Sequence, residues 1–171
     1  MAYIYITGGA SSGKSRFALD LFRDMKDVSF IATGAAADPE MEERIRTHRD
    51  QRPQTWETLE EQLDLVKAVK NTDRRHRGII IDCLTFWVSN LIYSAHFSHE
   101  HILSLARTTA FYLEQCSKKI AVVSGELGMG VVPPTPEGRS FRKTAGEVNQ
   151  IFSAKSKNAY LVVSGITLNI K

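Results

Sequence analysis

A glycine-rich turn near the start of the chain constrains the fold more than any other segment. The apolar run Tyr3–Thr7 predicts a β-strand, and a glycine loop of eight residues follows it before a stretch of helical period. The loop matches G-x-x-x-x-G-K-[S/T], whose small residues let backbone N–H groups wrap a phosphate at a helix N-terminus. A tight turn without function rarely reproduces all four fixed positions between a strand and a helix. The segment therefore predicts a P-loop, with these candidate nucleotide ligands: Gly8, Gly9, Ala10, Ser11, Ser12, Gly13, Lys14 and Ser15.

Further short β-rich runs alternate with segments of helical period. The runs cover Val28–Thr33, Gly78–Asp82, Ile120–Ser124 and Tyr160–Ser164, and most are continuously apolar, as strands covered on both faces are. The alternation predicts an α/β fold of the P-loop NTPase (RecA-like) class, with a mostly parallel central sheet and helices on both faces. After a turn at Gly165, alternating apolar residues predict a C-terminal edge hairpin. We expect one catalytic domain over residues 1–171.

Several helices are expected between these strands. Asp38-Pro39-Glu40 is typical of a helix start and Pro53 bars continuation, which predicts a helix over residues 39–51. A second helix is predicted from Ser98 to about Cys116. A third is predicted from an apolar stripe with an acidic first turn; the stripe is Leu59, Leu63, Val66 and Val69, and the turn is Glu57, Glu60 and Glu61. Four glycines and three prolines predict irregular structure over residues 125–138.

Composition excludes several classes of protein. The net charge of +3 is spread along the chain, without a basic run that would follow a nucleic-acid backbone or a membrane surface. The longest apolar stretch is interrupted by polar residues, so we expect no membrane span. The first residues lack the layout of a signal peptide, and Cys83 and Cys116 lack partners at metal-ligand spacing. A cytoplasmic protein that binds no nucleic acid is expected.

Two residues are candidate Mg²⁺ ligands. Asp82 ends the apolar strand over residues 78–82, where P-loop proteins place a carboxylate that holds the ion or its water. The Ser15 hydroxyl of the P-loop is the expected second ligand, while Lys14 reaches the β- and γ-phosphates. An aspartate at a strand end also caps the segment that follows it in many proteins. The P-loop favours the metal interpretation.

A P-loop does not by itself determine the reaction, because it describes how phosphates are held. On the predicted helix over residues 39–51, Arg44 and His48 lie on one face, and the next step reaches Arg52. Neutral imidazole attacks phosphorus, and guanidinium groups stabilise departing phosphates. This pattern suits covalent nucleotidyl transfer, but the same spacing also occurs on solvated charged helices.

Beyond the P-loop, several short blocks follow one another at defined intervals: Phe30–Thr33, Arg44–Arg52, Asp82–Thr85, Gly128–Gly130 and Leu161–Gly165. In this order they resemble the adenosylcobinamide kinase/adenosylcobinamide-phosphate guanylyltransferase family of vitamin B12 assembly. The resemblance spans nearly the whole chain. It leaves the roles of Glu126 and Arg142 open.

The resemblance implies two reactions. The first phosphorylates the aminopropanol hydroxyl of adenosylcobinamide with ATP or GTP, and the second transfers GMP from GTP to that phosphate, giving adenosylcobinamide-GDP. His48 corresponds to the histidine that carries GMP, and Lys14 is the second catalytic candidate. Besides the P-loop, the implied nucleotide contacts are Thr33, Gly34, Ala35, Arg49, Asp50, Gln51, Arg52, Glu60 and Asp82. The P-loop residues imply Mg²⁺, and we expect no permanently bound cofactor. The resemblance also implies a corrinoid substrate and a homo-oligomer, with a trimer as the expected form.

Two other functions fit the same P-loop. A single-activity P-loop kinase for another small molecule would use Lys14, Ser15 and Asp82 and leave His48 without a role. A nucleotide-dependent switch protein would use the loop to sense nucleotide and move a partner-binding segment. Only the block around His48 argues against the first, and the lack of added interaction segments argues against the second.

Overall fold

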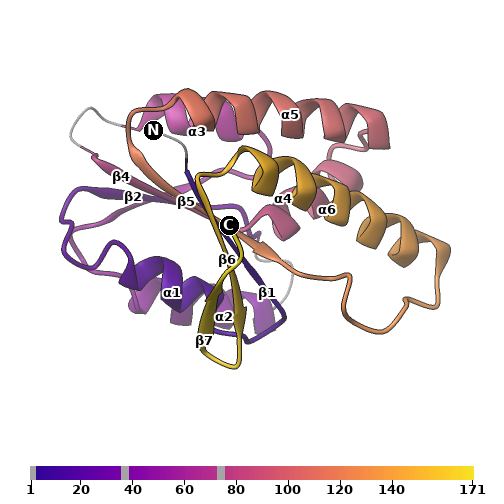
Figure 1. The fold of residues 1–171 in the computed structure, drawn as a ribbon, viewed down its shortest axis with the longest axis horizontal. Helices are drawn as coiled ribbons and strands as arrows, with labels where there is room; N and C mark the ends of the chain where they lie inside the picture. Colours follow the sequence, from indigo (N-terminus) through magenta and orange to yellow (C-terminus); the bar gives the residue numbers. More distant parts are fainter. Residues whose placement is uncertain (1–2, 36–38, 73–75) are drawn as a thin grey trace.

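Seven strands form one sheet in the order β3-β2-β4-β5-β1-β6-β7 (Figure 1). The computed structural model describes residues 3–35, 39–72 and 76–171, and only the backbone of residues 40, 41 and 44. Every neighbouring pair is parallel except β6 and β7, which form an antiparallel hairpin. This confirms the predicted fold class and the edge hairpin. The strands are β1 Ile4–Gly8, β2 Val28–Ala32, β3 Glu57–Glu60, β4 Gly78–Asp82, β5 Lys119–Gly125, β6 Asn158–Val163 and β7 Ile166–Asn169.

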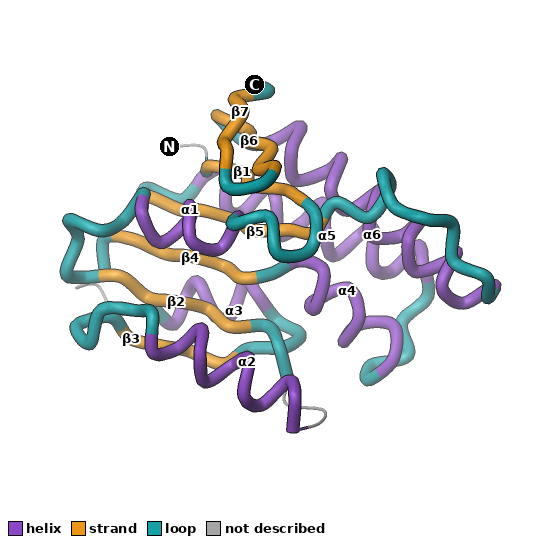
Figure 2. The backbone as a smooth tube through the Cα atoms, turned by 90° about the horizontal axis from the view of Figure 1, so that it is seen from below, coloured by secondary structure: helices purple, strands orange, loops and turns teal. Residues whose placement is uncertain are grey.

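Helices cover both faces of the sheet, as Figure 2 shows. One face packs against the larger apolar cluster, which includes Trp87, Leu113 and Phe152 from three of its helices. The other face packs against α1 and the turn that follows it, where Ala18 and Phe22 belong to the second apolar cluster. In Figure 2, α2 lies on the same side as α1. The helices are α1 Lys14–Asp20, α2 Pro39–Asp50, α3 Leu65–Asn71, α4 Leu84–Tyr93, α5 His99–Gln115 and α6 Pro136–Lys155.

The helix predicted from the stripe that starts at Leu59 is wrong in its first half. Residues 57–60 form the edge strand β3, paired in parallel with β2. The Glu61 carboxylate accepts hydrogen bonds from the backbone N–H groups of Leu63 and Asp64, so the chain turns here. Asp64 then caps α3 by accepting from Lys67 N–H. The apolar stripe therefore has helical spacing although its first residue lies in a strand and only its last residues lie in a helix.

The other predicted helices agree more closely with the structure. α2 spans Pro39–Asp50, as predicted, although its expected cap Asp38 lies outside the described residues. Ser98 caps α5 by accepting from His101 N–H. The segment after β5 is irregular only as far as Thr135, which caps α6 with Pro136 in its first turn. The prediction of an irregular segment to residue 138 missed this start, where a fixed proline φ favours a helix.

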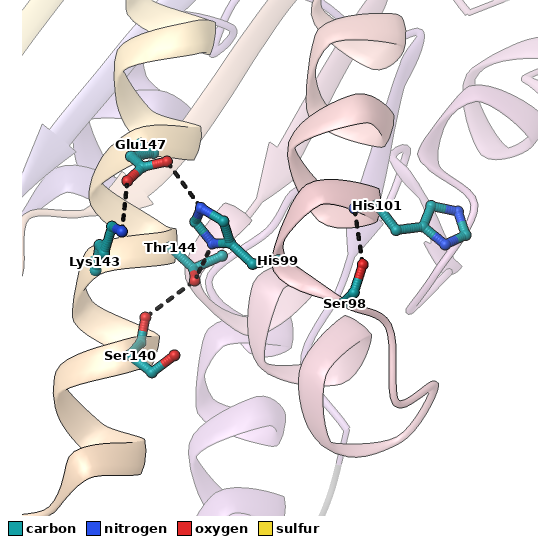
Figure 3. A network of polar contacts seen from close by, with 7 residues as sticks. All are labelled: Ser98, His99, His101, Ser140, Lys143, Thr144 and Glu147. Carbon is teal, nitrogen blue, oxygen red and sulfur yellow. Dashed lines mark hydrogen bonds and ion pairs between the residues drawn. The ribbon is translucent and has the colours of Figure 1, made fainter.

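Polar contacts join α5 to α6 (Figure 3). The His99 Nδ1 lies 3.0 Å from Thr144 Oγ1, and its Nε2 lies 3.1 Å from a Glu147 carboxylate oxygen. Thr144 in turn donates to the carbonyl oxygen of Ser140, one turn earlier in α6. The bridge therefore holds α6 against α5. In the described ranges, no helix is both long and apolar enough to cross a membrane.

Candidate functional site

A cavity of about 620 Å³ opens at the carboxyl ends of the parallel strands. Open α/β sheets bind ligands at this edge. Its wall is built by the P-loop, α2, the ends of β2 to β5 and the first turn of α4. The lining residues that carry the chemistry are Lys14, Ser15, His48, Arg49, Arg52, Glu60, Asp82 and Glu126.

The P-loop occupies the turn between β1 and α1. Gly13 is the N-cap of α1 and has φ 96°, a left-handed conformation that favours glycine. Lys14 Nζ donates to the Gly9 carbonyl oxygen at 3.0 Å, which holds the ammonium group over the loop. The Ser12 side chain is buried, and among the described residues its Oγ has no hydrogen-bond partner. A loop that offers backbone N–H groups, the Lys14 ammonium group and the Ser12 hydroxyl is suited to bind phosphate.

The aspartate that ends β4 and the serine that ends the P-loop reach the same cavity. Asp82 and Ser15 both line the cavity. No group of three or more His, Cys, Asp or Glu side chains that would hold a metal occurs in the described parts of the chain. Mg²⁺ at nucleotide sites is held by one or two protein oxygens together with phosphates and waters, so these two oxygen donors fit that ion.

Thr33 fixes the turn after β2 rather than facing the cavity. Its side chain is fully buried, and its hydroxyl donates to the Cys83 carbonyl oxygen and accepts from the Cys83 N–H, each at 2.7 Å. The Asn90 amide donates to the Thr33 carbonyl oxygen at 2.8 Å. Together these bonds hold Gly34 and Ala35, which do line the cavity.

The α2 wall brings His48 and Arg49 to the cavity, and the turn after the helix adds Arg52. The Arg52 guanidinium lies 3.5 Å from the centroid of the Phe30 ring and donates to the Thr58 hydroxyl at 3.0 Å. Burial lowers the pKa of Arg52 to about 10 and the Arg49 charge acts in the same direction, while the carboxylates of Asp82 and Glu60 favour its charged form. Arg52 is still cationic at neutral pH, and within the described residues its buried Nε has no partner.

The structure brings most of the predicted ligands together but leaves some away from the cavity. Five P-loop residues do not line the cavity: Gly8, Gly9, Ser11, Ser12 and Gly13. Asp50 is exposed at the end of α2. Gln51 lines a different hollow, of about 390 Å³, beside Arg16 and Trp56. The side chain of Arg44 lies outside the described residues. Sequence reasoning gave no role to Phe86 and Glu126, although the glutamate lies just beyond a predicted strand, close to the edge where Asp82 ends another.

Comparison with known proteins identifies the family of this chain. The profile of the family described as cobinamide kinase / cobinamide phosphate guanyltransferase matches residues 4–170. The chain belongs to this family.

Characterised relatives agree with that assignment. The bifunctional adenosylcobalamin biosynthesis protein CobU of Escherichia coli (strain K12) is 35% identical, over 98% of this chain and 99% of its own. CobU of Salmonella typhimurium has the same identity and coverage. The bifunctional adenosylcobalamin biosynthesis protein CobP of Pseudomonas aeruginosa is 35% identical over 97% of this chain and 95% of its own. The resemblance noted in the sequence is thereby confirmed: this is a kinase and guanylyltransferase family of cobalamin biosynthesis.

Proposed function

We propose that this chain carries out both reactions of its family in the one cavity. It would phosphorylate the aminopropanol hydroxyl of adenosylcobinamide with ATP or GTP, and then transfer GMP from GTP to that phosphate through a GMP adduct of His48. The product would be adenosylcobinamide-GDP. The observation that carries the proposal is that His48 lines the same cavity as the P-loop residues Lys14 and Ser15.

Phosphates are bound on the P-loop side. Backbone N–H groups of residues 8–15 and the Lys14 ammonium group neutralise the β- and γ-phosphates, and Lys14 continues to do so as charge moves during transfer. Ser15 and Asp82 would hold Mg²⁺, which supplies charge neutralisation on the phosphates when bound. The Gly34 and Ala35 backbone and the Arg49 side chain would complete the nucleotide contacts.

His48 is the proposed nucleophile of the second reaction. Its neutral imidazole nitrogen forms a bond to the α-phosphorus of GTP, while the bond to the oxygen that bridges the α- and β-phosphates breaks and pyrophosphate leaves. Arg52, stacked on Phe30, presents a positive charge to the departing phosphates. The phosphate of the phosphorylated substrate then attacks the same phosphorus atom, and His48 leaves as free imidazole.

Glu60 is the proposed contact to the guanosine. It ends the edge strand β3 and lines the cavity. A carboxylate there can accept hydrogen bonds from the N–H groups of a guanine edge or from a ribose hydroxyl. The position is explained by β3, because pairing with β2 places Glu60 opposite Ala32, at the ligand-binding edge.

We also propose that the protein is cytoplasmic and forms a homo-oligomer, a trimer as its family suggests. Each subunit would have one catalytic domain over residues 1–171. Exposed apolar side chains on the C-terminal hairpin support association between subunits: Val163, Ile166, Leu168 and Ile170. Light scattering after size exclusion would measure the subunit number. A monomer at micromolar concentration would overturn this part of the proposal.

Covalent labelling tests the guanylyltransferase half. The protein is incubated with GTP labelled at the α-phosphate, denatured, and examined for label that is acid-labile and alkali-stable. Wild type and the control His101→Ala, altered at an exposed histidine of α5, should retain label, whereas His48→Ala should retain none. GTP labelled at the γ-phosphate should label none of the three proteins. Phosphorylation of adenosylcobinamide without any retained α-label would instead indicate a single-activity kinase.

A further inference from the structure

Glu126 is an acidic residue of the cavity wall to which the reactions above assign no role. It follows the last residue of β5, the strand that pairs with the P-loop strand β1. Its backbone N–H donates to the carbonyl oxygen of Gly8 at 2.9 Å, so it continues the β1–β5 ladder beside the first glycine of the P-loop. Glu126 lines the same cavity as Lys14 and Asp82.

The end of β5 is held from two sides, which fixes where Glu126 begins. Asn149 of α6 accepts from the Ser124 hydroxyl at 2.6 Å and donates to the Gly125 carbonyl oxygen at 3.0 Å. The Gly125 N–H donates to the Thr85 hydroxyl of α4 at 2.7 Å. A residue on a strand end clamped by two helices has a defined position, as a catalytic group requires.

Within the described residues, Oε1 of Glu126 accepts a hydrogen bond from the protein and Oε2 accepts none. Oε1 accepts from the Gly128 N–H at 2.6 Å, and Arg142 of α6 donates to the carbonyl oxygen of Gly128. Within the described residues, Glu126 forms no ion pair. Burial raises the pKa of the nearby Tyr5, and the charge of Glu126 acts in the same direction, so the two side chains lie close to each other. Oε2 is therefore available to a proton donor in the cavity.

Strand register separates Glu126 from the candidate metal ligand. Asp82 is level with Val123 of β5, and Glu126 lies three residues further along the chain. At about 3.3 Å per residue, this is roughly 10 Å further toward the open side of the cavity. The backbones of the two residues thus lie at different depths, because Asp82 ends its strand and Glu126 lies just beyond the end of β5.

The remaining cavity carboxylates are less well placed for the acceptor. Glu60 ends β3, which is separated from β1 by three strands, and Glu42 lies on α2. Only Glu126 follows the strand that neighbours the P-loop strand at this edge, among the carboxylates that line the cavity in the described residues.

We infer that Glu126 is the general base of the phosphorylation reaction, an assignment that rests on the proposed kinase activity. The hydroxyl oxygen of the substrate forms a bond to the γ-phosphorus, and the bond from that phosphorus to the β,γ-bridging oxygen breaks, its electron pair leaving with the nucleoside diphosphate. The hydroxyl proton passes to Glu126 Oε2 and then to solvent. Arg142 is a positioning residue, because it acts on the glutamate through Gly128.

Glu126→Gln tests the assignment with little change of shape, because the amide oxygen can still accept from the Gly128 N–H. Phosphorylation of adenosylcobinamide by ATP and guanylylation of His48 by GTP are measured on the same preparations. General base catalysis contributes about 10²–10⁴-fold. We therefore expect kcat for phosphorylation to fall by about 10²-fold or more, while KM for ATP changes by less than about twofold. The guanylylation rate should fall far less than kcat for phosphorylation.

The pH profile gives a second readout. In wild type, kcat for phosphorylation should decline at acid pH as the base takes up a proton, and this decline should be absent in Glu126→Gln. Glu137→Gln, the same change at an exposed glutamate in the first turn of α6, is the matched control and should behave as wild type. If Glu126→Gln is poorly folded by thermal melting, Glu126→Asp replaces it and should keep the acid limb at reduced kcat.

The outcomes separate this inference from the proposed function. Wild type that does not phosphorylate adenosylcobinamide contradicts the proposed kinase activity itself. Wild type that is active, with a Glu126→Gln variant that keeps its kcat and its acid limb, overturns only the role of Glu126. Equal losses of phosphorylation and guanylylation would also overturn it, since they would indicate a general effect on nucleotide binding.

Discussion

The backbone N–H of Gly165 donates a hydrogen bond to the carbonyl oxygen of Ser12 across 2.9 Å. Gly165 lies in the turn between β6 and β7, so the C-terminal hairpin rests directly on the P-loop. Its φ is +80°, where a side chain is strained. The loop that binds phosphate is thus supported by a segment 153 residues later in the chain, and nucleotide binding and hairpin integrity should change together.

Gly165→Ala should destabilise the protein and weaken ATP binding. A Cβ at this position contacts nothing within 4 Å, so the cost comes from the backbone alone, about 1–2 kcal/mol for a left-handed residue. Denaturant unfolding and calorimetric titration with ATP measure the two effects. Gly146→Ala is the control, because it lies inside α6 with open space at its Cβ, and it should stabilise by about 0.5–1 kcal/mol. Unaltered ATP affinity in Gly165→Ala would show that the hairpin does not support the loop.

Thr33→Val should destabilise the fold, since the hydroxyl serves both backbone groups of Cys83. The Cys83 N–H would be buried without a partner, at a cost of about 1–3 kcal/mol. Thr33→Ser keeps both hydrogen bonds and loses only a methyl group, about 1 kcal/mol. Urea unfolding of the two variants separates these contributions. Equal stabilities of the valine and serine variants would contradict the structural role of the hydroxyl.

The sequence predicted those parts of the site that are contiguous in the chain. The P-loop motif occurs between a strand and a helix, so eight consecutive residues were enough to predict the strand, the turn and the helix of the phosphate site. Asp82 followed from an apolar strand ending in a carboxylate. β3 was missed because its pairing with β2 is a contact between distant segments, and the spacing of Leu59 and Leu63 fits a helix equally well. Thr33 was predicted as the last residue of a strand and lies directly after β2, which ends at Ala32. The sequence pattern does not reveal that its side chain binds the backbone of Cys83.

The α2 wall shows a different limit. From spacing alone, His48 could equally lie on a charged, solvent-exposed helix. Helix periodicity indicates which residues share a face, but not what that face contacts. Arg52 lies beyond the end of α2, where the Arg52 N–H donates to the Arg49 carbonyl oxygen in a turn. It reaches the cavity because its side chain lies on Phe30 of β2, a contact between different segments. The order of motifs along the chain supplied the information that periodicity lacked.

Arg52→Lys should slow guanylylation of His48 while leaving the fold intact. Lysine keeps the charge but loses the planar group that stacks on Phe30 and donates to Thr58 at the same time. Loss of one charge-assisted hydrogen bond, about 1.5–3 kcal/mol, corresponds to a rate at least about tenfold lower. Single-turnover labelling by GTP measures the rate. Arg107→Lys, at an exposed position of α5, is the matched control, and an equal rate in both variants would remove Arg52 from the reaction.

Cys83 should react slowly with iodoacetamide at neutral pH and faster as the pH rises. Burial raises its pKa to about 11, and the Asp82 charge adds to this. Only the thiolate reacts, so at pH 8 about one molecule in a thousand is reactive and the rate should rise about tenfold per pH unit. Peptide mass spectrometry follows Cys83 against the partly exposed Cys116, which should react first in the folded protein. Denaturant should abolish the difference, and GTP should slow Cys83 further, because this residue lines the cavity. Rapid modification of Cys83 in the folded protein at pH 7 would contradict its burial beside Asp82.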